Sequence, residues 1–165
     1  GMAAHRATGV ELYRPHHLAL LAEAYEKTGQ VEEGLRAVAE ALTVVDENGE
    51  RFYEAELYRL KGKLILQQFK VQSSESKVSS IQHLVPSTSA EVEAEACFLK
   101  AIEIAQRQQA KSFELRASTS LARLWQQQGK KSEDHKLLSY IYYWFAEGFN
   151  TKDLQEAKAL LDELQ

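Results

Sequence analysis

One short stretch of the chain combines the glycine, lysine and hydroxyl side chains that bind nucleotide phosphates in other proteins. Gly129, Lys130, Lys131 and Ser132 match the end of a phosphate-binding loop. The complete motif has another glycine five residues before its Gly-Lys pair, where this chain has Leu124, and a Ser or Thr directly after the lysine. It also follows a strand, and no strand is expected here. The stretch is therefore interpreted as a turn between two helices.

Metal ligands and nucleophiles are the next candidates for chemistry. Metal binding needs side chains that converge, but the histidines are scattered, and the adjacent His16 and His17 point in different directions on a helix. Cys97, next to Phe98, is interpreted as a small buried hydrophobe rather than a nucleophile. The many carboxylates lie beside lysines and arginines on helix faces, which is typical of solvated helix charge. We therefore predict no catalytic residue, no metal, no cofactor and no enzyme activity.

Polar residues at helical spacing are the candidates for partner binding. In stacked helix pairs the first helix of each pair lines the concave surface, and its residues that are not used for packing point at a ligand. Two interpretations stay open. Either the arginines on this concave face bind an acidic peptide through forked hydrogen bonds, or the face is solvated and carries ion pairs within a repeat, such as Glu56 with Arg59. The predicted binding residues are Glu56, Arg59, Lys63, Arg116, Arg123 and Gln127, and the same face would include His16, Glu23, Lys27 and Thr119.

An aromatic run near the C-terminal end is a second candidate surface. Ile141 and Phe145 belong to the core stripe of an expected helix, which places Tyr140, Tyr143 and Trp144 on its other side. Packing of these three rings against the last helix is the preferred interpretation. The alternative is an exposed patch for a neighbouring domain or for self-association, which would allow a homodimer.

A recurring pattern of large and small residues predicts the elements that position these side chains. Large residues three, four and seven apart form a buried stripe, and a small residue at each crossing lets two helices approach closely. The separation from Val38 to Ile65 equals that from Phe98 to Trp125, so consecutive pairs are linked in the same way. The pattern resembles the tetratricopeptide repeat. Its first copy consists of Leu18, Leu21, Ala22, Tyr25, Gly29, Gly34, Val38, Ala41 and Leu42.

The expected fold is all-α, a tetratricopeptide-like right-handed superhelix of three helix pairs with a C-terminal capping helix. Residues 1–13 are expected to form a flexible tail and 14–165 a single domain, with a mobile loop near 71–90 that is either a docking segment or, as we prefer, a tolerated insertion. Asp134 stands where the repeat has a small apolar residue, so it should weaken the third pair or tilt its second helix outward. The expected helices span 14–28, 31–46, 52–70, 91–109, 111–128, 132–147 and 151–164.

Longer strings of the sequence resemble one group of repeat proteins in particular. Residues 18–35, 49–62, 94–130 and 141–164 look like the C-terminal tetratricopeptide region of large bacterial signalling ATPases, often preceded by an adenylate/guanylate cyclase domain. The resemblance implies a scaffold or sensor role in signal transduction and no activity for this piece. It also implies a protein or peptide partner, for example an acidic segment or a sister ATPase or cyclase domain.

Composition and charge exclude several other classes. The net charge of −4 is unsuited to a nucleic-acid backbone, and no apolar run reaches the roughly 18 residues of a membrane-spanning helix. The single cysteine excludes an internal disulfide and fits a reducing compartment, so a cytoplasmic location is expected. The predicted function is protein–protein interaction, as a scaffold or sensor. The alternative is a receptor that binds a small molecule or a short signal peptide in the concave groove.

Overall fold

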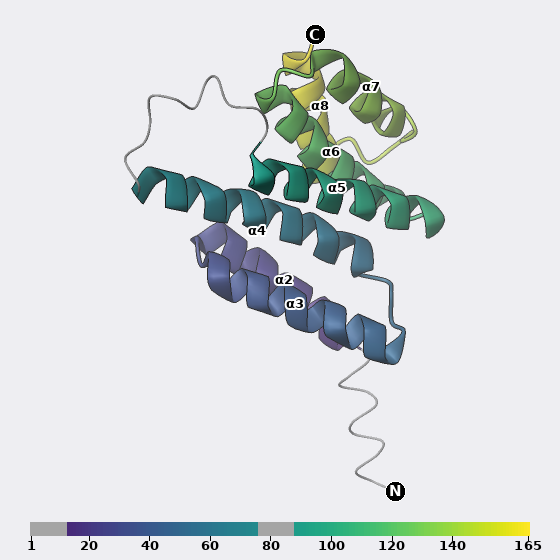
Figure 1. Ribbon diagram of the computed structural model, residues 1–165. Coiled ribbons are helices and arrows are strands. Elements are labelled where there is room, and N and C mark those ends of the chain that lie inside the picture. The colour runs from purple at the N-terminus through teal and green to yellow at the C-terminus, as the bar shows by residue number, and fades with distance from the viewer. Residues whose placement is uncertain (1–12, 76–87) are drawn as a thin grey trace, which may run out of the picture.

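The computed structural model describes residues 13–75 and 88–165 of the chain. Within these residues it contains helices and no strand, which confirms the all-α prediction for this part of the chain. In chain order the helices are α2 (Arg14–Thr28), α3 (Val31–Asn48), α4 (Glu54–Glu75), α5 (Ser89–Arg107), α6 (Lys111–Gln127), α7 (Lys131–Tyr142) and α8 (Lys152–Glu163) (Figure 1).

The helices stack in pairs along the molecule. Helices α2 and α3 lie at one end, α4 and α5 in the middle, and α6, α7 and α8 at the other end (Figure 1). Each helix packs on its neighbour in the chain, and α2 also contacts α4, α4 contacts α6, and α6 contacts α8. The even-numbered helices therefore follow one another along one side of the stack.

The first two helices each end at a glycine in the left-handed backbone conformation. Gly29 closes α2 with a φ of 76°, and Gly49 closes α3 with a φ of 74°. Glycine adopts this left-handed conformation without the steric cost that a side chain would add. The predicted end of the first helix at residue 28 is thereby confirmed.

Two predicted boundaries are wrong. The expected loop at 71–90 is helical at both edges, because α4 continues to Glu75 and a capping box between Thr88 and Glu91 starts α5; residues 76–87 lie outside the described part. The helix expected to reach residue 147 ends at Tyr142, where hydrogen bonds to the carbonyls of Ile141 and Tyr142 turn the chain. The predicted tail, apart from residue 13, also lies outside the described residues.

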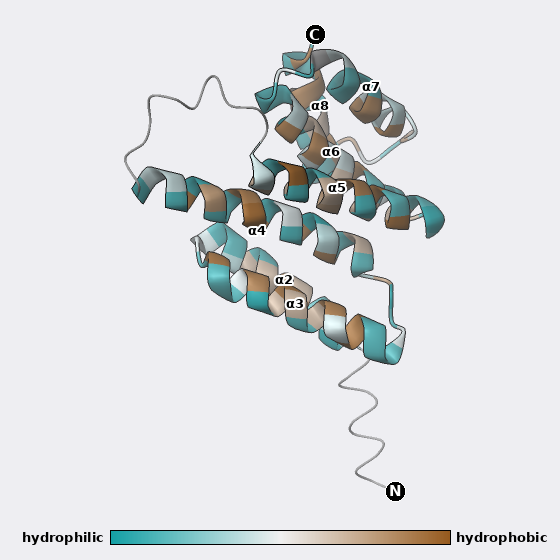
Figure 2. Cartoon of the chain, in the orientation of Figure 1, coloured by the Kyte–Doolittle hydropathy of each residue, from teal (hydrophilic) through white to brown (hydrophobic). Residues whose placement is uncertain are grey.

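Apolar residues gather on the helix faces that meet within the stack (Figure 2). Phe98 of α5 is 1% exposed and packs with Ile65 of α4 and Leu121 of α6, and Trp125 packs against the same cluster. The ring of Phe98 lies so close to Gly62 of α4 that a Cβ added there would be 2.6 Å from Cε1 of the ring. The predicted pairing of a small residue with a large one across two helices is confirmed at this crossing.

Asp134 is buried in the first turn of α7, with no exposed surface. Its Oδ1 accepts a hydrogen bond from the backbone N–H of His135, and its Oδ2 has no partner among the described residues. The expectation that this carboxyl group tilts the helix outward is wrong, because packing of Leu138 and Ile141 holds α7 in the core. A buried acceptor without a partner costs free energy relative to a solvated one.

Replacing Asp134 by alanine is therefore expected to raise the free energy of unfolding, by about 1–2 kcal/mol. Loss of the unpartnered oxygen stabilises by about 1–3 kcal/mol, and loss of an acidic side chain near a helix N-terminus removes roughly 0.3–1 kcal/mol. Urea denaturation measures the change. The matched control is Glu133→Ala, an exposed acid in the same turn, which should be neutral or slightly destabilising. Equal loss of stability in both variants would contradict this prediction.

Among the residues that the structure describes, no helix is both long and apolar enough to cross a bilayer.

Candidate functional site

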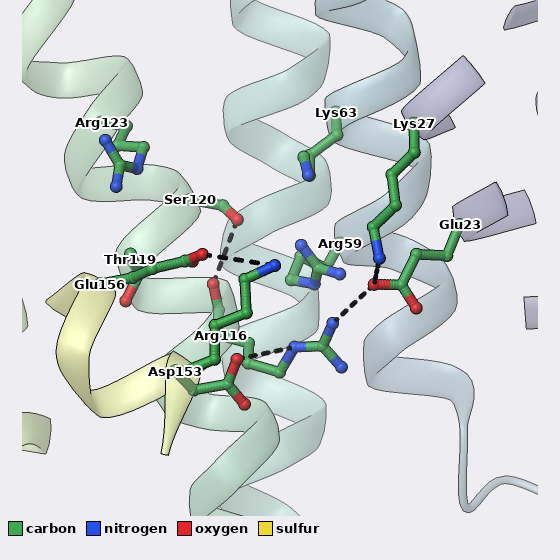
Figure 3. A pocket seen from close by; sticks show the side chains of 11 residues that line it. Glu23, Lys27, Arg59, Lys63, Arg116, Thr119, Ser120, Arg123, Asp153 and Glu156 are labelled. Atoms are coloured by element: carbon green, nitrogen blue, oxygen red, sulfur yellow. Dashed lines mark hydrogen bonds and ion pairs between the residues drawn. The ribbon is translucent and has the colours of Figure 1, made fainter. Parts of the chain in front are cut away.

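A cleft runs between the helices on the even-numbered side of the stack. Its volume is about 260 Å³, and side chains from α2, α4, α6 and α8 point into it (Figure 3). Six cationic and three acidic side chains line it. With the carboxylate of Glu56, which pairs with Arg59 beneath the lining, six cations face four acids, so positive charge is in excess on a chain whose net charge is −4. We call it the polar cleft; its lining is Glu23, Lys27, Arg59, Lys63, Arg116, Thr119, Ser120, Arg123, Lys152, Asp153 and Glu156.

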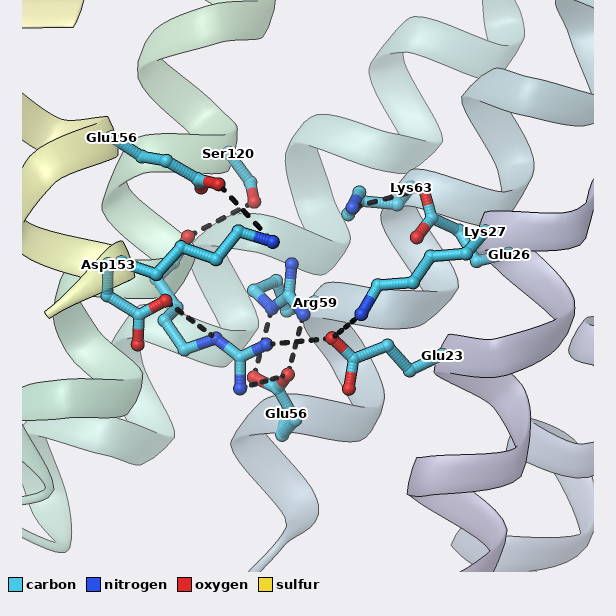
Figure 4. A network of polar contacts seen from close by, with 11 residues as sticks. Glu23, Glu26, Lys27, Glu56, Arg59, Lys63, Ser120, Asp153 and Glu156 are labelled. Carbon is cyan, nitrogen blue, oxygen red and sulfur yellow. Dashed lines mark hydrogen bonds and ion pairs between the residues drawn. The ribbon is translucent and has the colours of Figure 1, made fainter. Parts of the chain in front are cut away.

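A buried ion pair forms the base of the polar cleft. Glu56 and Arg59 of α4 are 4% and 5% exposed. The guanidinium group of Arg59 donates from Nε to Glu56 Oε2 at 2.9 Å and from Nη2 to Oε1 at 2.6 Å, one helical turn apart (Figure 4). This two-point geometry is the strong form of an arginine–carboxylate pair. Both side chains are thus occupied by each other.

Arg116 of α6 joins three helices to this pair. Its guanidinium group lies 2.8 Å from Glu56 Oε1, 3.4 Å from Glu23 Oε1 of α2 and 3.7 Å from Asp153 Oδ1 of α8. Figure 3 shows the contacts with Glu23 and Asp153. Lys27 also contacts Glu23, at 3.2 Å. The charges of this network balance, because three cations face three carboxylates. The members are Lys27, Arg59, Arg116, Glu23, Glu56 and Asp153.

The network shifts the protonation equilibria of two of its members. Burial alone would lower the pKa of Arg59, but the hydrogen bonds and negative charge of Glu56 outweigh it and raise that pKa. Burial alone would raise the pKa of Glu23, but the hydrogen bond from Lys27 and the charge of Arg116 outweigh it and lower that pKa. Both residues are therefore charged at neutral pH.

The lowered pKa of Glu23 predicts a pH-dependent contribution to stability. A carboxyl group whose pKa is lower in the folded state stabilises the fold above its unfolded pKa of about 4.3, and this stabilisation disappears as the pH falls through the folded value. Glu23→Gln should therefore lower the free energy of unfolding at pH 7, by about 0.5–1 kcal/mol, and have a diminishing effect below about pH 4. Denaturant titrations from pH 7 to pH 3 measure this, with the exposed Glu147→Gln as control. A difference that stays constant down to pH 3 would disprove the linkage.

A second cleft, of about 280 Å³, continues the first between α4 and α6. The two share Lys63, Ser120 and Arg123, so together they form one groove. We call the second one the α4–α6 cleft. Its lining is partly apolar and consists of Glu26, Lys63, Leu66, Gln67, Lys70, Phe98, Ser120, Arg123, Leu124 and Gln127.

The structure brings the predicted binding residues to the groove but gives them different environments. Arg123 and Gln127 are exposed, whereas Lys63 contacts Glu26 at 3.1 Å. Glu56 and Arg59 do not point freely at a ligand as predicted, because their mutual pair is buried. The ion pair of the alternative interpretation is present, although it is buried rather than solvated.

His16 does not reach the polar cleft. Its ring stacks on Tyr53 with the centroids 4.5 Å apart, and both rings line a separate depression near the start of α2. Its predicted place on the concave face is therefore corrected, since the groove-facing part of α2 begins at Glu23, two turns later.

The three aromatic rings of the second candidate surface are exposed. Tyr140, Tyr143 and Trp144 are 71%, 73% and 59% exposed. The preferred interpretation that they pack against the last helix is wrong, since Tyr142 and Phe145 occupy that interface with α8. Nζ of Lys111 lies 5.7 Å from the centroid of the Trp144 ring, which is within the range of a cation–π contact.

Cys97 is 7% exposed, and burial raises the pKa of its thiol. A buried thiol of raised pKa carries little thiolate, which agrees with its interpretation as a small apolar residue. Within residues 13–75 and 88–165, no group of three or more His, Cys, Asp and Glu side chains could hold a metal ion.

The contribution of α8 to the groove was not predicted from the sequence. Lys152, Asp153 and Glu156 line the polar cleft, although the last helix was expected only to cover the end of the stack. The polar residues along one face of the expected last helix could have indicated that this face borders the groove. Ser120 was also missed; it lies one residue after the predicted Thr119 and faces both clefts.

No family model, curated protein or solved structure matches the chain.

Proposed function

We propose that this chain is a non-catalytic, tetratricopeptide-like interaction module whose groove binds an acidic segment of a partner protein. The observation that carries the proposal is the excess of positive charge in the groove on a chain whose net charge is negative. Local excess charge of this kind attracts oppositely charged partners and orients them.

The repeat assignment is supported by how the helices contact one another. Stacked pairs in which α2, α4 and α6 lie side by side, with small residues at crossings such as Gly62, are what this class of repeat requires. Following the resemblance of the sequence, we place the module in cytoplasmic bacterial signal transduction, as a scaffold or sensor. The partner would then be an acidic surface of a sister ATPase or cyclase domain, or a peptide from another protein.

Panning a library of random twelve-residue peptides against the full chain tests this proposal. We expect enrichment of peptides rich in Asp and Glu, and loss of their capture by the double variant Lys63→Glu with Arg123→Glu. The control carries the same charge change at exposed residues of α3 and α7, Arg36→Glu with Lys136→Glu, and should capture them normally. Failure to enrich any peptide, or equal capture by both variants, would refute the proposal.

The groove is less suited to the alternative ligand, a single small molecule. Ligand pockets for such molecules usually measure about 300–1,000 Å³. The two clefts measure about 260 and 280 Å³ and follow one another along the groove. An extended peptide can cross both, so a peptide is the ligand that we favour, including a short signal peptide.

A further inference from the structure

The unbalanced positive charge of the groove lies at one place within it. Lys27, Arg59, Lys63, Arg116 and Lys152 each have a carboxylate partner within 4 Å. Within the described residues, no such partner lies beside Arg123 of α6 or Lys70 of α4, and both line the α4–α6 cleft. Figure 3 shows Arg116 with dashed lines to Glu23 and Asp153, and shows Arg123 on the same helix. An incoming anion therefore meets free cations at Arg123, where the two clefts join, and at Lys70 in the α4–α6 cleft.

The same cleft contains a buried hydrogen-bond acceptor without a partner. Nε2 of the Gln67 side chain donates to the backbone carbonyl of Glu26 at 3.1 Å, which holds the amide in place across the gap between α4 and α2. The other end of the amide, Oε1, is buried and receives no hydrogen bond among the described residues. Because Oε1 has no accessible surface, the N–H of a bound peptide reaches it only when the amide group turns toward the cleft; the new hydrogen bond then removes the cost of an acceptor without a partner.

Apolar side chains form the floor of the α4–α6 cleft. Leu66 lies one turn along α4 from Lys63, while Phe98 and Leu124 are almost fully buried and border the cleft from α5 and α6. Phe98 and Leu124 have almost no surface left to cover, so an aliphatic side chain placed here would mainly cover the half-buried Leu66 and leave water. This burial is favourable by roughly 25 cal/mol per Å² of apolar surface. A ligand that offers only a charged group would leave this apolar surface exposed to water.

We propose that the α4–α6 cleft is the specificity site of the groove and binds an internal Asp or Glu together with an aliphatic residue two positions away. This inference rests on the proposed function. In an extended peptide, side chains two positions apart point to the same side, so both can enter the cleft. The carboxylate pairs with Arg123 and Lys70, the aliphatic side chain covers Leu66, and a peptide N–H donates to Gln67 Oε1. In the rest of the polar cleft Arg59 and Arg116 are already neutralised, so this part joins α2, α4, α6 and α8 and does not determine specificity.

Binding of short synthetic peptides to the full chain, followed by ¹H–¹⁵N NMR, tests the inference. The probe is Ser-Gly-Leu-Ser-Glu-Ser-Gly with an acetylated N-terminus and an amidated C-terminus, so that only the side-chain carboxylate is charged. We expect shifts of the Gln67 side-chain amide signal, and a Kd at least about tenfold higher when Glu is replaced by Gln in the peptide. Replacement of Leu by Ser, or removal of the spacer between Leu and Glu, should weaken binding about as much.

Protein variants assign these effects to the cleft. In Arg123→Gln the advantage of the Glu peptide over the Gln peptide should shrink, and in the double variant Arg123→Gln with Lys70→Gln the two peptides should bind equally weakly. The control, Arg36→Gln with Lys136→Gln, should behave as the unmodified chain. Gln67→Leu should weaken binding several-fold. It removes the hydrogen bond to Glu26 together with the acceptor that has no partner, two changes that act in opposite directions on stability, so binding is compared without denaturant at a temperature where both chains are folded. The inference is overturned if the Glu peptide keeps its advantage in the double variant, or if the Gln67 signal does not move.

The result also separates this inference from the proposed function. If the peptides enriched by panning bind with no dependence on Arg123 or Gln67, the groove binds peptides elsewhere and only the specificity site is wrong. If neither the panned peptides nor the synthetic ones bind, both proposals fail.

Discussion

Replacing Phe98 by alanine is expected to lower the free energy of unfolding by about 3–5 kcal/mol, the usual cost of removing a fully buried aromatic ring. The ring joins α4, α5 and α6, since it packs with residues of all three helices and also borders the α4–α6 cleft. Its loss would leave a cavity where the middle pair meets the third pair. Urea denaturation followed by circular dichroism measures the effect. The adjacent Leu99→Ala is the control: Leu99 is largely exposed on the same helix and should change stability by about 0.5 kcal/mol or less.

The contact between Phe98 and Gly62 makes a sharper version of this prediction possible. Gly62→Ala alone should destabilise the chain by roughly 1–2 kcal/mol, because the added methyl group overlaps the ring and a buried ring has no free space to move into. In a chain that already carries Phe98→Ala the overlap is gone. The same substitution should then stabilise by up to about 1 kcal/mol, the ordinary preference of a helix for alanine over glycine. A Gly62→Ala effect of equal sign in both backgrounds would mean that the two residues are not in contact.

The features that local sequence determines were predictable. Gly29 ends α2 because glycine alone adopts the required φ without strain, and this signal needs no knowledge of the rest of the chain. The crossing of Gly62 with Phe98 was predictable from the alternation of small and large residues. The pair of Glu56 and Arg59 was open to prediction too, since residues three apart share a helix face.

The features that depend on tertiary placement were not predictable. Arg116 meets Glu23 across 93 positions of sequence, and no local pattern indicates which carboxylate an arginine will reach. The sequence therefore identified the cations of the groove without revealing which of them are already neutralised. The end of α7 at Tyr142 has the same origin: Tyr142 and Phe145 pack against α8, and this contact requires the chain to turn before the helical pattern ends.

Removal of the Glu56 carboxylate is the second substitution with a large expected effect. Glu56→Gln should lower the free energy of unfolding by about 3–5 kcal/mol, because the guanidinium group of Arg59 would remain buried without its ionic partner. Arg116 would lose its shortest ion pair at the same time. Guanidinium chloride screens ion pairs, so urea is the suitable denaturant. The exposed pair of Glu103 with Arg107 provides the control, and Glu103→Gln should cost less than about 1 kcal/mol.

Replacing both members of the pair separates the value of the charges from the cost of leaving one alone. In Glu56→Leu with Arg59→Met no buried charge is left unpaired, so most of the stability lost in Glu56→Gln should return. If the double variant is as unstable as the single one, the pair itself holds α4 in place. In either case peptide binding at Arg123 should survive in the folded double variant, because the α4–α6 cleft uses neither residue of the pair. The NMR titration with the Leu-Ser-Glu probe measures this binding. Its loss in the double variant would mean that the polar cleft, and not the α4–α6 cleft, determines the specificity of the groove.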